Sequence, residues 1–163
     1  MPQRYLIYAA VAVAAGFIQK FLFARLAIGG DALGMTSRLQ PDLILVLLVY
    51  LARTEGQLTG TTSGFLSGLL MDFLSGTLGA NAFSKTVSGF VAGYFSDAEQ
   101  RDNQTAFLVA LAVSSFTGNF FYYLLMSALT IPIWKLLLIY SLGGAVYNVL
   151  IGFVLFHALL KRL

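Results

Sequence analysis

The 163-residue sequence contains no cysteine and a single histidine, His157. Disulfide bonds, thiol chemistry and thiolate metal sites are therefore excluded, and one histidine alone supplies neither a histidine metal cluster nor a conventional catalytic triad. Charged residues are also scarce, at 10% of the chain, against about 25% in soluble domains. The basic side chains are scattered and the net charge is only +3, so the sequence gives no indication of nucleic-acid binding.

Hydrophobic residues make up 58% of the chain, and the mean hydropathy is +0.82. A soluble fold of this size could not bury so much apolar surface, so the sequence predicts an integral membrane protein in contact with lipid. We predict one membrane-embedded domain, an all-α compact bundle of about six transmembrane helices. The predicted helices are residues 5–24, 41–54, 58–74, 78–95, 105–130 and 133–158.

Two of these segments need comment. The stretch "MPQRYLIYAAVAVAAG" could pass for a secretory signal peptide, but its apolar character continues to Phe23, so we predict a retained first helix. In the second segment, Pro41 suits the first turn of a helix and Asp42 suits its positive end. Only "LILVLLVYLA" follows before Arg53. This segment is a tilted span, a half-membrane helix or the first arm of a helical hairpin.

The distribution of Lys and Arg predicts the orientation, because these residues favour the cytoplasmic side. With both termini inside, five basic residues face the cytoplasm and three face outward. The first group is Arg4, Arg53, Arg101, Lys161 and Arg162, and the second is Arg25, Arg38 and Lys135. The chain is therefore predicted to be a multi-pass membrane protein with cytoplasmic N- and C-termini.

The middle of the chain carries two stripes of small residues. The third segment has Gly60, Gly64, Gly68 and Asp72 at four-residue spacing, and the fourth has Lys85, Gly89 and Gly93. Such stripes let membrane helices approach closely. The turn "SGTLGA", with Gly76 and Gly79, joins the two segments. We therefore predict an antiparallel hairpin with facing glycines.

The register of this hairpin can also be predicted, because residues at equal depth have numbers with a constant sum. The pairs Gly64 with Gly93, Gly68 with Gly89, and Asp72 with Lys85 all sum to 157. This register predicts an ion pair, or shared polar neighbours, between Asp72 and Lys85. The pair is interpreted as a structural clamp or as a contact for a substrate or partner. Ion translocation is disfavoured, because a relay needs several ionisable groups in series.

Two amides lie within the last predicted spans, Asn119 and Asn148. Amides inside a membrane should face protein rather than lipid, so these residues either pack between helices or line a ligand cavity or partner groove. No carboxylate pair at glycosidase-like spacing, phosphate loop or nucleophile elbow occurs in the sequence. We therefore predict a non-enzymatic protein without a metal or cofactor.

The stretch from "PDLILVLLVYLARTEGQLTG" to "GFLSGLLMDFLSGTLGANAFSKTVSGFVAGYF" resembles the MreD family of rod shape-determining membrane proteins. The resemblance covers roughly residues 40–95, and beyond them the spans match only in hydropathy and number. Its motif is a Pro-Asp start, a Gly-rich span with an Asp, and a short Gly turn. The matching positions are Pro41, Asp42, Gly64, Gly68, Asp72, Gly76 and Gly79.

The resemblance implies a non-enzymatic scaffold of the peptidoglycan-elongation machinery, located in the bacterial inner (cytoplasmic) membrane. Its bundle would bind the transmembrane helix of MreC, with MreB, RodA and a class B penicillin-binding protein nearby. MreD is also similar in fold to the substrate-binding S-components of energy-coupling-factor vitamin transporters. The alternative is therefore a subunit that binds a vitamin or lipid-like molecule in a bundle cavity. A pocket of about 300–1,000 Å³ with convergent polar groups would distinguish a binder from a scaffold.

Overall fold

The computed structural model describes residues 13–20, 40–96, 103–127 and 132–158, and these residues are largely helical. Residues 13–20 are helical, and the remainder of the predicted helix 5–24 lies outside the described residues. The following helices are α2 (Leu43–Glu55), α3 (Gln57–Ser75), α4 (Ala80–Gly93) and α5 (Gln104–Ser127). The last helix consists of α6 (Ile133–Lys135), the π-helical segment η4 (Leu136–Leu142) and α7 (Gly143–Ala158). The predicted all-α class is confirmed for this part of the chain.

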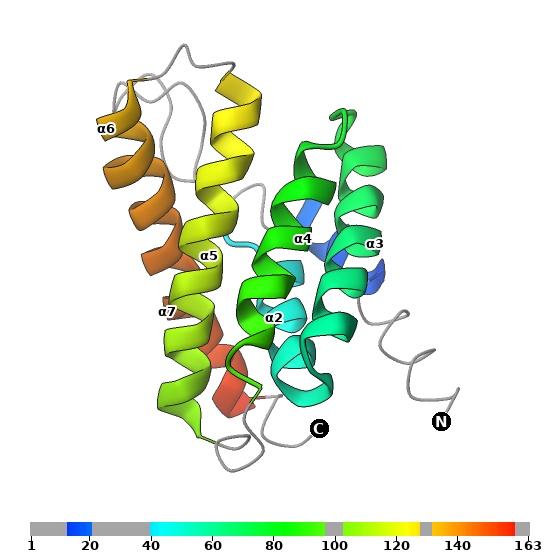
Figure 1. The fold of residues 1–163 in the computed structure, drawn as a ribbon, viewed down its shortest axis with the longest axis vertical. Helices are drawn as coiled ribbons and strands as arrows, with labels where there is room; N and C mark the ends of the chain where they lie inside the picture. Colours follow the sequence, from blue (N-terminus) through cyan, green and yellow to red (C-terminus); the bar gives the residue numbers. More distant parts are fainter. Residues whose placement is uncertain (1–12, 21–39, 97–102, 128–131, 159–163) are drawn as a thin grey trace.

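The helices form a bundle in which α4 packs between α3 and α5, and the last helix packs on the other side of α5 (Figure 1). Helix α2 lies behind α4 in this view and contacts α3, α4, α5 and α7. The α3–α4 turn, the end of α5 and α6 lie at the upper end of the bundle (Figure 1). The central position of α2 brings its start within reach of several other helices.

Helix α2 is short because it is an interior helix. Its 13 residues rise about 20 Å, less than the hydrocarbon core of about 30 Å. A helix that is apolar all round is stable only when it is surrounded by other apolar groups, and Val46, Val49 and Ala52 are fully buried. Pro41, just before the helix, is also fully buried. The chain therefore starts α2 inside the bundle.

The hairpin turn depends on two glycines with left-handed backbone conformations. Gly76 ends α3 with φ of 70°, and Gly79 precedes α4 with φ of 80°. Glycine adopts positive φ without the steric cost that a Cβ imposes, and glycine just after the last helical residue is the commonest way to end a helix. The turn therefore reverses the chain within four residues, at the position that the sequence predicts.

The two glycine stripes face each other, and the backbones of α3 and α4 are in contact there. A Cβ added at Gly60 would come within 3.0 Å of the Gly89 carbonyl oxygen, and one at Gly64 within 3.0 Å of the Lys85 carbonyl oxygen. Gly68 meets the backbone of Ala82, and Gly93 meets that of Gln57. Because glycines bring backbone against backbone at Gly60, Gly64 and Gly68, the axes of the two helices come close together.

The predicted register of the hairpin is wrong by about eight residues, a little more than two helical turns. Gly89 lies opposite Gly60 instead of Gly68, and Lys85 lies opposite Gly64 instead of Asp72. The prediction assumed that both helices start at equal distances from the middle of the turn. In the structure α3 continues past the first turn of α4, and the carboxylate of Asp72 reaches the first amides of α4. The facing pairs Gly60 with Gly89 and Gly64 with Lys85 therefore share the sum 149 instead of the predicted 157.

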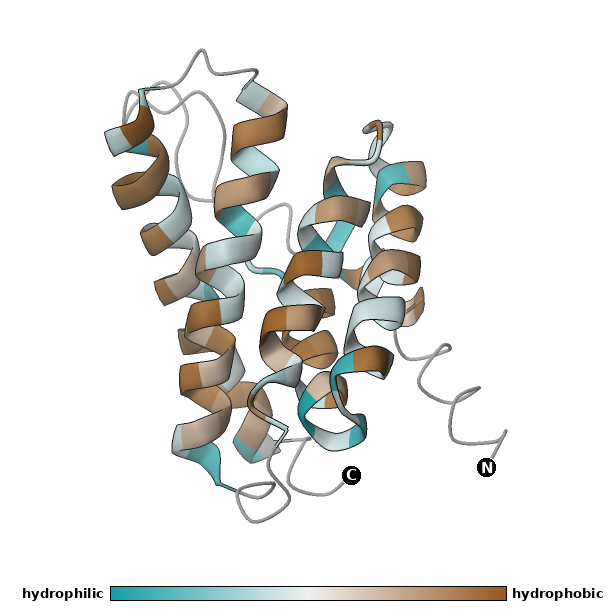
Figure 2. Cartoon of the chain, viewed as in Figure 1, coloured by the Kyte–Doolittle hydropathy of each residue, from teal (hydrophilic) through white to brown (hydrophobic). Residues whose placement is uncertain are grey.

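Many large apolar side chains are exposed on the outside of the bundle, and apolar residues recur along all of its described helices (Figure 2). Among the most exposed are Leu58, Leu66, Phe73, Leu78, Leu138 and Leu150. A soluble protein rarely exposes contiguous apolar surface of this kind, so these faces are suited to lipid. Two described helices, Gln104–Ser127 and the continuous helix Ile133–His157, are long and apolar enough to cross a membrane.

A buried polar cluster at the start of α2

Four polar residues from four helices meet where α2 begins. They are Asp42, which precedes α2, Lys85 on α4, Ser115 on α5 and Asn148 on α7. We call these four residues the α2-start cluster. Lys85, Ser115 and Asn148 are buried, and the Asp42 side chain keeps 20% of its surface exposed. The cluster lies in an otherwise apolar interior, where polar groups are stable only when their hydrogen bonds are made.

Asp42 forms polar contacts through both carboxylate oxygens and through its own amide. One carboxylate oxygen accepts a hydrogen bond of 3.0 Å from the Leu45 amide, and the other forms an ion pair with the Lys85 ammonium group. Its own amide donates a hydrogen bond of 2.8 Å to the side-chain oxygen of Asn148. The predicted role of Asp42 as the cap of the second helix is confirmed, since a carboxylate at this position bonds an otherwise free amide of the first turn.

Asn148 and Asn119 share Ser115 as a partner. The Nδ2 atom of Asn148 donates a 2.7 Å bond to Ser115 Oγ, and the Nδ2 atom of Asn119 donates a longer bond of 3.4 Å to the same oxygen. Asn148 is 1% exposed and therefore faces protein, as predicted. Asn119 is half-buried, and a Cβ at Gly144 would touch its side chain. The side chain of Asn119 is thus more exposed than that of Asn148, and its hydrogen bond to Ser115 is longer.

Gln19 extends the polar region towards the first helix. It is 3% exposed, and its side-chain oxygen accepts a 3.2 Å hydrogen bond from the Ile44 amide in the first turn of α2. Neither Gln19 nor Ser115 was among the residues predicted from the sequence. Both lie inside apolar predicted spans, where a polar side chain is itself a signal of an internal contact. The serine pair in "SSFTGN" carries that signal only weakly.

The predicted ion pair between Asp72 and Lys85 is wrong, because Lys85 pairs with Asp42. The pairing places a positive charge beside the start of α2, where Asp42 supplies the negative charge that a helix N-terminus favours. Removing one partner of such a buried pair leaves an uncompensated charge. The pair therefore fixes α4 against the start of α2, an interaction between residues 43 positions apart.

Asp72 instead stabilises the start of α4. Its two carboxylate oxygens accept hydrogen bonds of 3.0 Å from the Asn81 amide and 2.9 Å from the Ala82 amide, and a further bond comes from the Thr77 hydroxyl. The residue at the cap position itself, Gly79, has no side chain to offer. Asp72 is therefore a helix cap that the preceding helix supplies, which makes its role structural.

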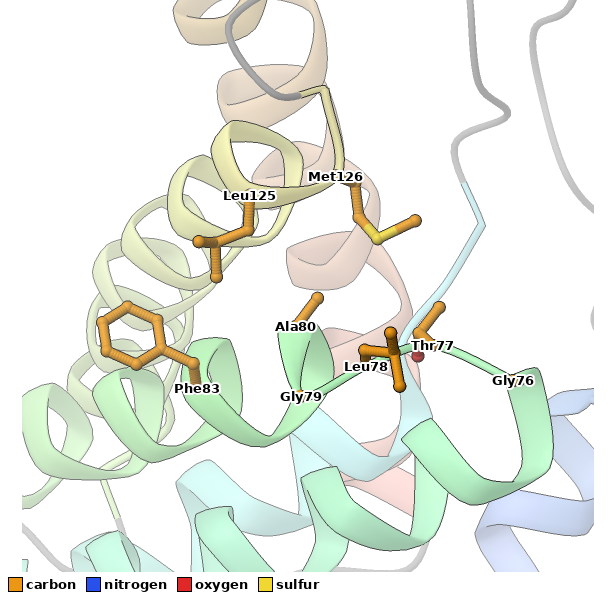
Figure 3. Close-up of a pocket in the computed structure, with 8 residues that line it drawn as sticks. All are labelled: Gly76, Thr77, Leu78, Gly79, Ala80, Phe83, Leu125 and Met126. Atoms are coloured by element: carbon orange, nitrogen blue, oxygen red, sulfur yellow. The ribbon is translucent and has the colours of Figure 1, made fainter.

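A separate apolar groove of about 560 Å³ lies at the upper end of the bundle (Figure 3). In Figure 3, Phe83 and Ala80 on α4 and Leu125 and Met126 on α5 border it, together with the turn between α3 and α4. Its volume is in the range of small-molecule pockets, but Thr77 is the one hydroxyl-bearing residue that lines it, and convergent polar groups are missing. The groove therefore lacks the polar groups that would define a ligand's orientation. Within the described ranges no three His, Cys, Asp or Glu side chains are grouped as a metal site would require.

Comparison with known families decides between the two interpretations of the sequence. Residues 3–163 match the family described as ECF-type riboflavin transporter, S component. The chain belongs to this family. No curated protein matches the chain. The family match covers nearly the whole sequence, whereas the likeness to MreD covered roughly residues 40–95.

Membership of the S-component family corrects the assignment to MreD and the scaffold function that it implied. The expected partners MreC, MreB, RodA and a class B penicillin-binding protein are withdrawn with it. The physical reason for the error is that the shared motif describes packing. Pro41 and Asp42 start a helix, Asp72 caps another, and the glycines bring two helices together. Any compact membrane bundle can use such residues.

S-components are integral proteins of the cytoplasmic membrane, so this part of the predicted location stands, while the orientation of the termini stays a prediction. The members of this family are subunits of transporters and are generally not enzymes. This agrees with the expectation of a non-enzymatic protein.

Proposed function

We propose that this chain is the substrate-binding subunit of an ECF-type transporter and that its ligand is riboflavin or a closely related flavin. The observation that carries the proposal is the match of residues 3–163 to the riboflavin S-component family. The subunit would capture the vitamin at the outer side of the membrane and deliver it through an energy-coupling module made of a T-component and ATPases.

The α2-start cluster supports this proposal by its place in the bundle. Because α2 is short and begins inside the bundle, its polar start lies below the α3–α4 turn, at the depth of Lys85 on α4. A ligand that enters from the upper end would meet Asn119, whose amide makes only a long bond to Ser115 within the described part of the chain. Flavins present hydrogen-bond donors and acceptors along one edge of a flat ring, and amides can pair with both kinds of group.

Aromatic side chains near this level suit a flat ring. The rings of Tyr123 on α5 and Tyr140 on η4 lie 4.7 Å apart at an angle of 39°. Aromatic rings favour offset and tilted stacking on one another, and the isoalloxazine ring of a flavin offers a larger surface of the same kind. We assign ring contacts to the tyrosines and edge contacts to Asn119, with the α2-start cluster as the rigid base beneath.

Riboflavin titration of the purified protein tests the proposal. Flavin fluorescence should be quenched with a stoichiometry near 1:1 and a Kd of roughly 1 μM or tighter, about −8 kcal/mol. The Asn119→Ala variant should bind at least about tenfold more weakly, a loss of about 1.4 kcal/mol. Asn81→Ala is the matched control, because Asn81 bonds Asp72 and Thr77 at the hairpin turn. A folded protein that leaves flavin fluorescence unchanged at micromolar concentrations would refute the function.

A further inference from the structure

The last span consists of two unlike halves. Its upper half, α6 and η4, contains seven residues of π-helix, from Leu136 to Leu142. The Ser141 hydroxyl donates a 2.8 Å hydrogen bond to the Leu136 carbonyl, five residues back, and so bridges the widened turn. Stretches of π-helix are rare, and many of them occur at functional sites. The lower half, α7, is a regular α-helix.

The lower half is firmly attached to the bundle. Asn148 on α7 bonds both the Asp42 amide and the Ser115 hydroxyl. One turn further on, a Cβ added at Gly152 would touch the side chain of Leu111 on α5, so the two helices are in close contact there. Helix α7 contacts α2 as well as α5.

Among the described elements, the upper half packs on one helix outside its own span, α5, whereas α7 packs on both α5 and α2. Within the described elements, η4 packs mainly on α5 and on its own neighbours α6 and α7. Tyr140 stacks on Tyr123 of α5. On the opposite side Leu138 and Leu142 are exposed to the lipid region. Tyr140 and Ser141 are nonetheless buried, so outward movement of this half would uncover them.

The two halves meet at a junction that can bend. Gly143 and Gly144 follow directly after the π-helical segment. Sharp bends in helices occur at glycines and at π-bulges, and here the two features are adjacent. The junction also lies next to Asn119, since a Cβ at Gly144 would meet that side chain. Bending at this point would open a path between α5 and the last helix towards the α2-start cluster.

We propose that η4 and Gly143–Gly144 form a hinge and that residues 132–142 swing away from α5 as a lateral gate for the ligand. The role as a ligand gate rests on the proposed function, whereas the hinge motion itself does not. The anchored α7 stays in place, so the base of the site is unchanged while its wall opens. The opening lies at the upper end of the bundle, on its lipid-facing side, and suits a flat ligand that partitions into the interface between membrane and water.

Thiol accessibility measures the motion without a ligand, and the natural absence of cysteine makes the chain a ready background. Ser141→Cys and Ser114→Cys form a matched pair, because both serines are fully buried. Ser114 lies on α5, where its carbonyl oxygen accepts a bond from Ser88 on α4. The thiol at position 141 should react with a maleimide at least tenfold faster than the thiol at position 114. Equal rates at the two positions would overturn the hinge.

Cross-linking then tests whether the motion admits the ligand. A bifunctional thiol reagent can bridge α5 to the last helix above the hinge in Tyr123→Cys/Tyr140→Cys, or below it in Leu111→Cys/Gly152→Cys. Because the upper pair replaces the two tyrosines assigned to the flavin ring, each variant is compared with its own unbridged form, at riboflavin concentrations that saturate that form. Bridging the upper pair should slow riboflavin association at least tenfold, and bridging the lower pair should change it less than twofold. An unchanged rate with the upper pair bridged would overturn the gate.

The two proposals fail in different ways. If neither the native protein nor any variant binds riboflavin, but the thiol at position 141 still reacts faster than the thiol at position 114, the hinge stands and the proposed function fails. If the native protein binds riboflavin and position 141 is as unreactive as position 114, the function stands and the hinge fails.

Discussion

Two carboxylates, Asp42 and Asp72, stabilise helix starts inside this membrane protein. Each accepts hydrogen bonds from amides in the first turn of a helix, α2 for Asp42 and α4 for Asp72. They differ in their other partners, because Asp42 is paired with the cation of Lys85 while Asp72 accepts from Thr77 and Asn81. An acidic side chain inside a membrane protein can therefore serve to stabilise the fold without taking part in transport.

The first residue-scale prediction concerns Asp72. Asp72→Ala leaves the first amides of α4 without acceptors, so the free energy of unfolding should fall by about 2 kcal/mol. Asp72→Asn keeps one acceptor oxygen and should lose about half as much. Unfolding in detergent, followed by circular dichroism, measures both. An alanine variant as stable as the native protein would contradict the capping role.

A second residue-scale prediction concerns the buried ion pair. Lys85→Met leaves the carboxylate of Asp42 without its counter-charge and should cost about 3 kcal/mol of stability. In the double variant Asp42→Asn/Lys85→Met no charge remains, and asparagine can still cap α2, so most of the loss should be recovered. A double-mutant cycle of unfolding free energies gives the coupling. Strictly additive losses would show that the pair is not coupled.

At the scale of elements, the α3–α4 hairpin depends on glycines at helix contacts. At most of the glycines where α3 and α4 touch, the backbone of one helix contacts the backbone of the other, as at Gly64 and Lys85. We call this line of contact the seam. The seam also determines where Lys85 lies, because Lys85 is itself one of the contact residues. Close packing of α3 and α4 is therefore a condition for the α2-start cluster as well as for the hairpin.

Gly64→Ala tests this dependence. The added methyl group would overlap the Lys85 carbonyl oxygen, and overpacking of this kind typically costs 1–3 kcal/mol, so we expect a loss of about 2 kcal/mol. Because the separated helices would also displace Lys85, flavin affinity should fall together with stability. Leu66→Ala is the control on the same helix, since Leu66 is largely exposed. Equal effects of the two substitutions would contradict the contact.

At the scale of the whole molecule, the orientation in the membrane connects the fold to transport. We predict cytoplasmic termini from the distribution of Lys and Arg. That orientation places the α3–α4 turn, with the fully exposed Leu78, on the outer side. The upper end of the bundle, from which the polar cluster would be reached, then faces the source of the vitamin.

Labelling of single cysteines tests the orientation. A membrane-impermeant maleimide added to intact cells should label Leu78→Cys at the α3–α4 turn. Glu55→Cys, next to the α2–α3 turn, is exposed in the structure but should be labelled only after the cells are opened. The reverse pattern would show that the termini lie outside.

Some residue roles could be predicted from the sequence and others could not. The Asp42 cap, the glycine turn and the facing stripes follow from local spacing, and the structure confirms them. The partner of Lys85 could not be predicted, because the relevant distance joins helices that are far apart in the sequence. Gln19 and Ser115 escaped notice for the same reason, since a single polar residue in an apolar span does not show which helix it meets.

The sequence by itself determined that this chain is a helical membrane protein, because its apolar content and helical spacing leave no other stable arrangement. It also determined where helices start and turn, since caps and glycines act within a few residues. Only the tertiary structure decided the register of the hairpin, the Lys85–Asp42 pair and the meeting of four helices at the start of α2. Those features depend on how segments distant in the sequence pack together, and local spacing carries no information about that packing.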